Sequence, residues 1–189
     1  GGNTILRLCT FWADCWFFLI GIRYKKIDES KVDLLDRQFI FVTNHISYLD
    51  SALLVKTHRK PFRPLAKAEM GKIPIFGLIY RNATVTVDRT DSTNRANSVR
   101  ILKSIIGKGI SVLVFPEGTF NTTGKPLKSF YDGAFRLAIE TQTPIRPVLF
   151  LDTYSRMNYK SIFSLNPGRC RVVYMEEIPV NGLKIKNIE

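Results

Sequence analysis

Apolar runs alternate along the chain with amphipathic segments, which predicts strands alternating with helices. Residues 39–43 and 110–115 are apolar at nearly every position and predict two buried strands. Residues 92–106 are typical of a helix, because Asp91 or Ser92 can cap its start and an apolar stripe is formed by Val99, Leu102, Ile105 and Ile106. Further strands are predicted at 63–66, 83–87, 145–150 and 170–174, and further helices at 50–56, 74–80 and 131–141.

This order of elements predicts an α/β fold with a mainly parallel central sheet covered by helices on both faces. Strands that are apolar throughout are buried on both sides, which is typical of parallel sheets. A length of 189 residues suits one domain with a short appendage. We therefore expect an N-terminal membrane-interface helical segment, residues 1–28, followed by one domain, residues 29–189.

The N-terminal segment is the most hydrophobic part of the chain. Residues 5–22 contain fourteen apolar residues in eighteen, interrupted by Arg7 and Asp14. We interpret this segment as an amphipathic helix in or along a membrane interface, although a helix packed on the protein's own core fits equally well. No uninterrupted apolar run reaches the roughly 20 residues of a membrane span. A basic cluster follows, formed by Arg23, Lys25 and Lys26.

The charge balance predicts an anionic partner. Lys and Arg number 28 against 16 Asp and Glu, giving a net charge of +12, and residues 56–108 carry nine of these charges. The partner could be a phosphate, an anionic lipid or a nucleic acid, and the simpler alternative is a solvated basic face. Basic segments interleaved with aromatic residues and a recognisable reading helix are both lacking, so we expect no nucleic acid.

The cysteine and histidine content argues against two kinds of stabilising site. Three cysteines and two histidines, without paired spacing, make a disulfide framework and a structural zinc site unexpected, so we predict no metal. The chain begins Gly1-Gly2 without Met, from which we expect that an upstream segment is missing.

Two polar motifs follow predicted strands directly. Asn-His-Ile-Ser-Tyr-Leu-Asp, residues 44–50, comes after the strand at 39–43, and Phe-Pro-Glu-Gly-Thr, residues 115–119, closes the strand at 110–115. Ligands of open α/β sheets bind outside the carboxyl ends of the strands, so both motifs could face one crevice.

His45 and Asp50 form the first candidate pair. The Asp50 carboxylate could accept a hydrogen bond from one ring nitrogen of His45 and leave the other nitrogen free to act as a base. This arrangement would be a catalytic triad that lacks a nucleophile from the protein. A substrate hydroxyl could then supply the nucleophile. The alternative is a capping Asp near a structural His. His58 has no such partner and is expected at the surface.

The other candidates are charged residues at strand ends. Glu117 could accept from a substrate hydroxyl, but an exposed turn residue is the simpler interpretation. Arg89, after the strand at 83–87, could bind a phosphate bidentately, and Lys67 could add a point charge. Both could equally be members of a basic surface.

Together these motifs resemble the glycerolipid acyltransferase family, in its 1-acylglycerol-3-phosphate acyltransferase branch. The resemblance runs from residue 39 to 150, and the ordered pair of His-x4-Asp and Phe-Pro-Glu-Gly-Thr makes it specific. The four blocks that carry it are Asn44-His45-x4-Asp50, Asp88-Arg89, 115–119 and Arg146-Pro147-Val148.

The resemblance implies a reaction and its residues. His45 would deprotonate the free hydroxyl of a lysophospholipid acceptor, and Asp50 would hold the imidazole. The hydroxyl would attack the thioester of acyl-CoA or acyl-carrier protein, giving phosphatidic acid without any cofactor. Arg89 would bind the acceptor's phosphate, and Lys67 matches a basic position of the family. Residues positioning the acceptor would be Glu117, Gly118 and Thr119.

The resemblance also implies a location. Residues 29–189 would be the acyltransferase catalytic domain, and the N-terminal segment would lie in one leaflet with basic residues facing an anionic membrane surface. The enzyme would then be associated with the cytoplasmic face of a membrane, which is the inner membrane in a bacterium.

Departures from the family pattern leave the acceptor open. Phe120-Asn121 stand where the family commonly has Arg-Ser, so one phosphate ligand is missing, and Lys125 or Lys128 could substitute. Acylation of a lyso-aminolipid is therefore a variant within the same chemistry. A different alternative is a non-catalytic protein that binds membrane surfaces through its basic residues. Further differences are Asn82-Ala83, Val85 and residues 130–133.

Overall fold

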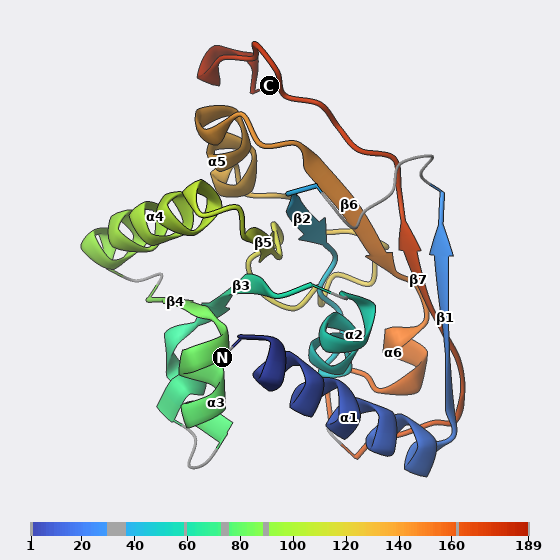
Figure 1. Cartoon of the computed structure of the whole chain (residues 1–189). Coiled ribbons are helices and arrows are strands. Elements are labelled where there is room, and N and C mark those ends of the chain that lie inside the picture. The colour runs from blue at the N-terminus through green and yellow to red at the C-terminus, as the bar shows by residue number, and fades with distance from the viewer. Residues whose placement is uncertain are drawn as a thin grey trace.

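Seven strands in the described part of the chain form one sheet, in the order β1–β7–β6–β2–β5–β3–β4, in a computed structural model (Figure 1). The structure describes residues 2–29, 37–58, 60–72, 76–88, 91–161 and 163–188. Neighbouring strands are parallel, apart from the antiparallel pair β6 and β7. The strands are β1 (Ile22–Asp28), β2 (Ile40–Thr43), β3 (Phe62–Lys67), β4 (Val85–Val87), β5 (Ser111–Val114), β6 (Ile145–Phe150) and β7 (Gly168–Tyr174).

Helices cover both faces of this sheet. The helices α1 and α2 pack on one face, and α4 and α5 pack on the other (Figure 1). This arrangement confirms the predicted fold class. The helices are α1 (Gly2–Ile20), α2 (Asp50–Thr57), α3 (Phe76–Ala83), α4 (Ser92–Gly107), α5 (Gly133–Thr141) and α6 (Thr153–Arg156), with 3-10 turns η1 (Ala68–Lys72) and η2 (Ile185–Asn187).

The strand β2 separates two hydrophobic cores. Phe39, just before β2, and Phe41 belong to the core under α1 and α2, whereas Ile40 and Val42 belong to the core under α4 and α5. Successive side chains of a strand point to opposite faces, so a strand covered on both sides needs apolar residues at every position. This explains why apolar and polar residues do not alternate along residues 39–43.

The strand β1 corrects the prediction that residues 1–28 are helical. The helix α1 ends at Ile20, Gly21 turns the chain with φ +76°, and Ile22–Asp28 pairs with β7 along its whole length. Cationic side chains occupy exposed positions of β1, such as Arg23 and Lys25, so its apolar pattern is weak. This weak pattern is the reason that the sequence alone indicates the basic end of a helical segment here.

The helix α1 carries two apolar faces. Ala13 and Phe17 are buried in the core shared with α2. The opposite side exposes a second group, which we call the α1 stripe, whose members are between 55% and 85% exposed: Leu8, Phe11, Trp12, Phe18 and Leu19. Core packing therefore accounts for only one side of the helix. None of the described helices combines the length and hydropathy needed to cross a bilayer.

His58 is buried, which contradicts the expectation that it lies at the surface. It is 6% exposed, and its ring centroid lies 4.4 Å from that of Phe41 and 4.3 Å from that of Phe62. Its Nδ1 atom lies 3.0 Å from the carbonyl oxygen of Leu54. Burial lowers the pKa of His58 from 6.5 to about 4, because the charged ring would lose its hydration.

This burial predicts a loss of stability in acid. Below its ordinary pKa the unfolded chain protonates His58, while the folded chain keeps the ring neutral until about pH 4. Between about pH 7 and about pH 4, we expect the free energy of unfolding to fall by about 3 kcal/mol more in the wild type than in His58→Leu. Urea denaturation at several pH values measures both curves, and parallel curves would contradict the assignment.

Candidate active site

The two polar motifs meet at one edge of the sheet. The strand β2 is parallel to β5, so the turn at 44–49 and the loop that follows Val114 both leave from the carboxyl ends of the strands. A hydrogen bond of 3.0 Å from the His45 amide to Glu117 Oε1 joins them. The expectation that both motifs face one place is therefore confirmed.

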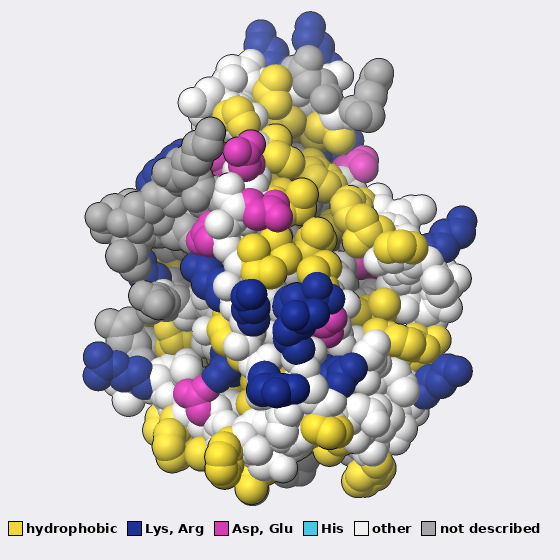
Figure 2. All heavy atoms as spheres, turned by 90° about the vertical axis from the view of Figure 1, so that its right-hand side faces the viewer, with side chains coloured by type: hydrophobic (Ala, Val, Ile, Leu, Met, Phe, Trp, Pro, Cys, Tyr) yellow, Lys and Arg dark blue, Asp and Glu magenta, His cyan; other side chains and the backbone are white. Residues whose placement is uncertain are grey.

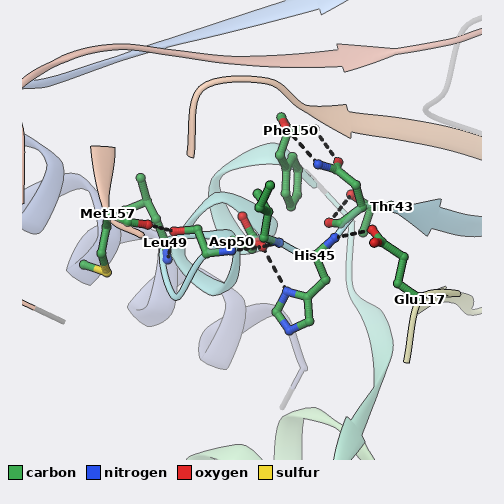
Figure 3. A network of polar contacts seen from close by, with 10 residues as sticks. Thr43, His45, Leu49, Asp50, Glu117, Phe150 and Met157 are labelled. Atoms are coloured by element: carbon green, nitrogen blue, oxygen red, sulfur yellow. Dashed lines mark hydrogen bonds and ion pairs between the residues drawn. The ribbon is translucent and has the colours of Figure 1, made fainter. Parts of the chain in front are cut away.

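Asp50 holds the imidazole of His45 (Figure 3). The Nδ1 atom lies 2.9 Å from Asp50 Oδ2, which also accepts from the amides of Ile46, at 2.9 Å, and Ser47, at 3.0 Å. A carboxylate is an acceptor only, so Nδ1 donates and a neutral ring keeps its lone pair on Nε2. The Asp50 side chain is fully buried, whereas that of His45 is 21% exposed. His45 can thus act as an oriented base that solvent or a substrate reaches.

Side-chain hydrogen bonds to residues distant in the sequence fix the turn that carries His45. The side-chain amide of Asn44 donates to the carbonyl of Phe150 at 3.0 Å and accepts from the Phe150 amide at 2.8 Å (Figure 3). Ser47 Oγ donates to the carbonyl of Met157 and accepts from the Leu49 amide. These two roles were missed in the sequence, although both residues lie inside the first motif.

Glu117 is buried, which contradicts the simpler interpretation of an exposed turn residue. Its side chain is fully inaccessible, and both carboxylate oxygens accept backbone amides. The His45 amide donates to Oε1 and the Lys128 amide donates to Oε2, each at 3.0 Å. A buried carboxylate needs such donors to offset its lost hydration. Glu117 therefore ties the backbone of the base to the loop that follows β5.

Aromatic rings surround the imidazole. The ring centroid of His45 lies 4.0 Å from that of Phe115 in a stacked arrangement, and 4.3 Å from that of Phe120. Phe120 also contacts the half-exposed Tyr48 edge to face, at 4.9 Å. Phe120 stood out in the sequence as a departure from the family, but its contact with the base was not predicted.

The next two residues of the second motif, Gly118 and Thr119, continue the loop that follows β5. Gly118 has φ +77°, a conformation that favours glycine, and its amide closes a turn on the carbonyl of Phe115. Thr119 is exposed, and its hydroxyl accepts from the Lys128 ammonium at 2.9 Å.

Lys67 and Arg146 make other contacts. Lys67 ends β3 and pairs with Glu69 at 3.3 Å. Arg146, from the fourth block, is fully buried in β6 and pairs with Asp28 at 3.1 Å. Arg89 lies outside the described residues. Within the described ranges, we find no group of three or more His, Cys, Asp or Glu residues that could hold a metal ion.

Comparison with known proteins gives consistent relatives. A family model described as Acyltransferase matches residues 22–151. The chain is 30% identical over 178 residues to a chloroplastic 1-acyl-sn-glycerol-3-phosphate acyltransferase of Arabidopsis thaliana, covering 92% of this chain and 49% of that protein. It is 28% identical over 192 residues to the human 1-acyl-sn-glycerol-3-phosphate acyltransferase beta, covering 100% of this chain and 68% of that protein.

A solved structure shares the architecture. The 1-acyl-sn-glycerophosphate (LPA) acyltransferase PlsC from Thermotoga maritima superposes with a TM-score of 0.76 at 25% identity, covering 95% of this chain and 70% of that chain. The chain spans about half the length of the first curated relatives, 44% of an algal protein from Chlamydomonas reinhardtii and 49% of the Arabidopsis protein.

The Glu117 bridge predicts a stability effect. In Glu117→Gln the new NH2 group faces one of the two amide donors, so a buried N–H loses its acceptor. We expect the free energy of unfolding to fall by about 1–3 kcal/mol, measured by urea denaturation near neutral pH. The same change at Glu140, which pairs with Lys103 on the surface, is the control and should leave the denaturation midpoint nearly unchanged. A Glu117→Gln protein as stable as that control would contradict the bridge.

Proposed function

The chain belongs to the acyltransferase family, and from this membership we propose that it transfers a fatty acyl group from a thioester to the free hydroxyl of 1-acylglycerol-3-phosphate. The product is phosphatidic acid. The donor is acyl-CoA or acyl-carrier protein, and the reaction uses no further cofactor. The observation that carries the proposal is the His45–Asp50 pair, whose second ring nitrogen lies on the side of the ring away from Asp50 (Figure 3).

The reaction proceeds by general base catalysis. Nε2 of His45 takes the proton of the acceptor hydroxyl as its oxygen attacks the thioester carbonyl carbon. The new C–O ester bond forms, the C–S bond breaks, and the protonated ring returns its proton to the departing thiolate. Asp50 stabilises the imidazolium that exists between these two transfers, because its buried carboxylate faces Nδ1.

The acceptor itself is the nucleophile, so no acyl-enzyme forms. The buried Cys170 does not serve as a nucleophile, because burial raises the pKa of its thiol to about 12. Glu117 acts as a positioning residue for His45, since both of its oxygens are taken by backbone amides. Gly118 and Thr119 line the acceptor's place beside the base. We retain Arg89 and Lys67 as charged residues that attract the acceptor's phosphate.

His45→Ala tests the base directly. With purified protein in liposomes, lysophosphatidic acid and acyl-CoA or acyl-carrier protein thioester, we expect thiol release to fall on the order of a hundredfold or more. Asp50→Asn should also lose most activity, since the ring is then held in the wrong tautomer.

Glu140→Gln, on the surface of α5, is the control for handling and folding. Near-normal acyl transfer by His45→Ala would contradict the mechanism. Turnover of a lyso-aminolipid in place of lysophosphatidic acid would keep the chemistry and change the acceptor.

We also propose that the protein works at the cytoplasmic face of a membrane, where thioester donors are present and the lysophospholipid resides. The α1 stripe supplies a continuous apolar surface for the interface between lipid and water. Trp12 in this stripe has the amphipathic ring that favours the headgroup level.

A basic surface adjoins the end of α1. Arg23 and Lys25 on β1 and Arg169 on β7 line a concavity of about 570 Å³. Arg23 is the direct neighbour of Arg169 in the parallel ladder, and like charges placed so closely repel each other. An anionic surface would offset this repulsion. Figure 2 shows basic side chains gathered on this side of the molecule, with hydrophobic side chains above and below them.

Membrane association is testable by vesicle sedimentation. We expect Phe11→Glu combined with Phe18→Glu to weaken binding to phosphatidylglycerol-containing vesicles about tenfold or more, since each change removes an exposed aromatic ring that would be buried in the interface. Ile101→Glu, an exposed apolar residue of α4, is the matched control and should bind like the wild type. Equal binding by the double variant and the control would exclude α1 as the contact.

A further inference from the structure

Two lysines of the loop after β5 could take the place of the phosphate ligand that Phe120-Asn121 do not supply, and the structure distinguishes between them. The Lys128 side chain turns back to the second motif, where its ammonium donates to Thr119 Oγ1 at 2.9 Å. Its backbone amide is bound by the buried Glu117 carboxylate at 3.0 Å. Both ends of Lys128 are therefore held next to the catalytic motif.

Lys125 has a different role. Its carbonyl accepts from the Asn121 side chain at 2.9 Å and its amide donates to the Thr123 hydroxyl, so its backbone closes a turn at Gly124. Its side chain is exposed in that turn. The hydrogen bonds described for Lys125 are thus made by its main chain, whereas Lys128 contacts Thr119 through its ammonium.

The hydrogen-bond donors at Thr119 and Lys128 favour an anionic ligand. An ammonium has three donors, and the contact with Thr119 uses one of them. The Thr119 hydroxyl accepts that bond, so its own proton remains to be donated. Among the ion pairs of the described residues, none gives Lys128 an acidic partner. Lys128 and Thr119 therefore present donors and a net positive charge, which suits a phosphate monoester.

The connection between Lys128 and His45 through Glu117 suits the same ligand. The two oxygens of Glu117 accept the amides of His45 and Lys128, so these two backbones flank a single carboxylate. In 1-acylglycerol-3-phosphate the free hydroxyl and the phosphate are on adjacent carbons. An enzyme that deprotonates this hydroxyl must bind the phosphate close to its base, and Lys128 occupies such a position.

We propose that Lys128, with the Thr119 hydroxyl, binds the phosphate monoester of the acceptor and thereby determines acceptor specificity. This inference rests on the proposed function and names the residue that replaces the arginine expected in the second motif. Phe120, whose ring centroid lies 4.3 Å from that of His45, leaves the position of that arginine without charge, and Lys128, eight residues further along the chain, supplies a positive charge in its place.

The test compares acceptors with and without the phosphate. For Lys128→Ala we expect the KM for lysophosphatidic acid to rise about tenfold or more, because a hydrogen-bonded charge is lost. The KM values for the thioester and for monoacylglycerol, the same acceptor without its phosphate, should change less than about twofold. Lys128→Arg should restore most of the affinity, and Lys125→Ala is the matched control, expected to resemble the wild type.

Three results would overturn the inference. These are an unchanged KM in Lys128→Ala, an equal loss in Lys125→Ala, and an equal loss with monoacylglycerol. Calorimetric titration of a short-chain lysophosphatidic acid into the wild type and both alanine variants separates this inference from the proposed function. Binding that depends on Lys128 without any turnover would sustain the site and refute the reaction, whereas no binding by the wild type would refute the site.

Discussion

The buried carboxylate of Glu117 is the constraint on which the site depends. A charged group without solvent must be hydrogen-bonded, and here both partners are main-chain amides from different segments, His45 after β2 and Lys128 in the loop after β5. The loop is further attached by the Asn121 amide, which donates to the His45 carbonyl at 2.7 Å. The base and the loop that faces it therefore keep one relative position.

The sheet topology makes this bridge possible. Since β2 lies between β5 and β6 and is parallel to both, three chain segments leave the sheet at the same edge. Asn44 connects the turn to the end of β6, and Glu117 connects it to the loop after β5. The turn that carries His45 is thus fixed on two sides, and Asp50 at the start of α2 fixes the ring itself. Such preorganisation suits a base that must meet a bound hydroxyl.

The helix α1 shows how one segment serves two surfaces. Ala13 and Phe17 complete the core with α2, while the α1 stripe remains outside it. A helix needed only for the core would keep its outer face polar. The two interpretations of the N-terminal segment therefore describe opposite sides of the same helix, and the exposed side is the one that our proposed membrane contact uses.

The sequence by itself determined most of the strands and helices between residues 39 and 174, the mainly parallel fold class and His45 with Asp50 as a candidate pair, but it did not reveal the strand β1. These features are local, because hydrophobic periodicity reports backbone geometry and a spacing of five residues spans one turn. Only the tertiary structure decided that Glu117 and His58 are buried, that Phe120 covers the base and that Lys128 rather than Lys125 lies beside Thr119. Each of these depends on which segments become neighbours in the folded chain. The order in which the strands lie side by side in the sheet arises from packing across the whole sheet. No local pattern of apolar and polar residues encodes this spatial order.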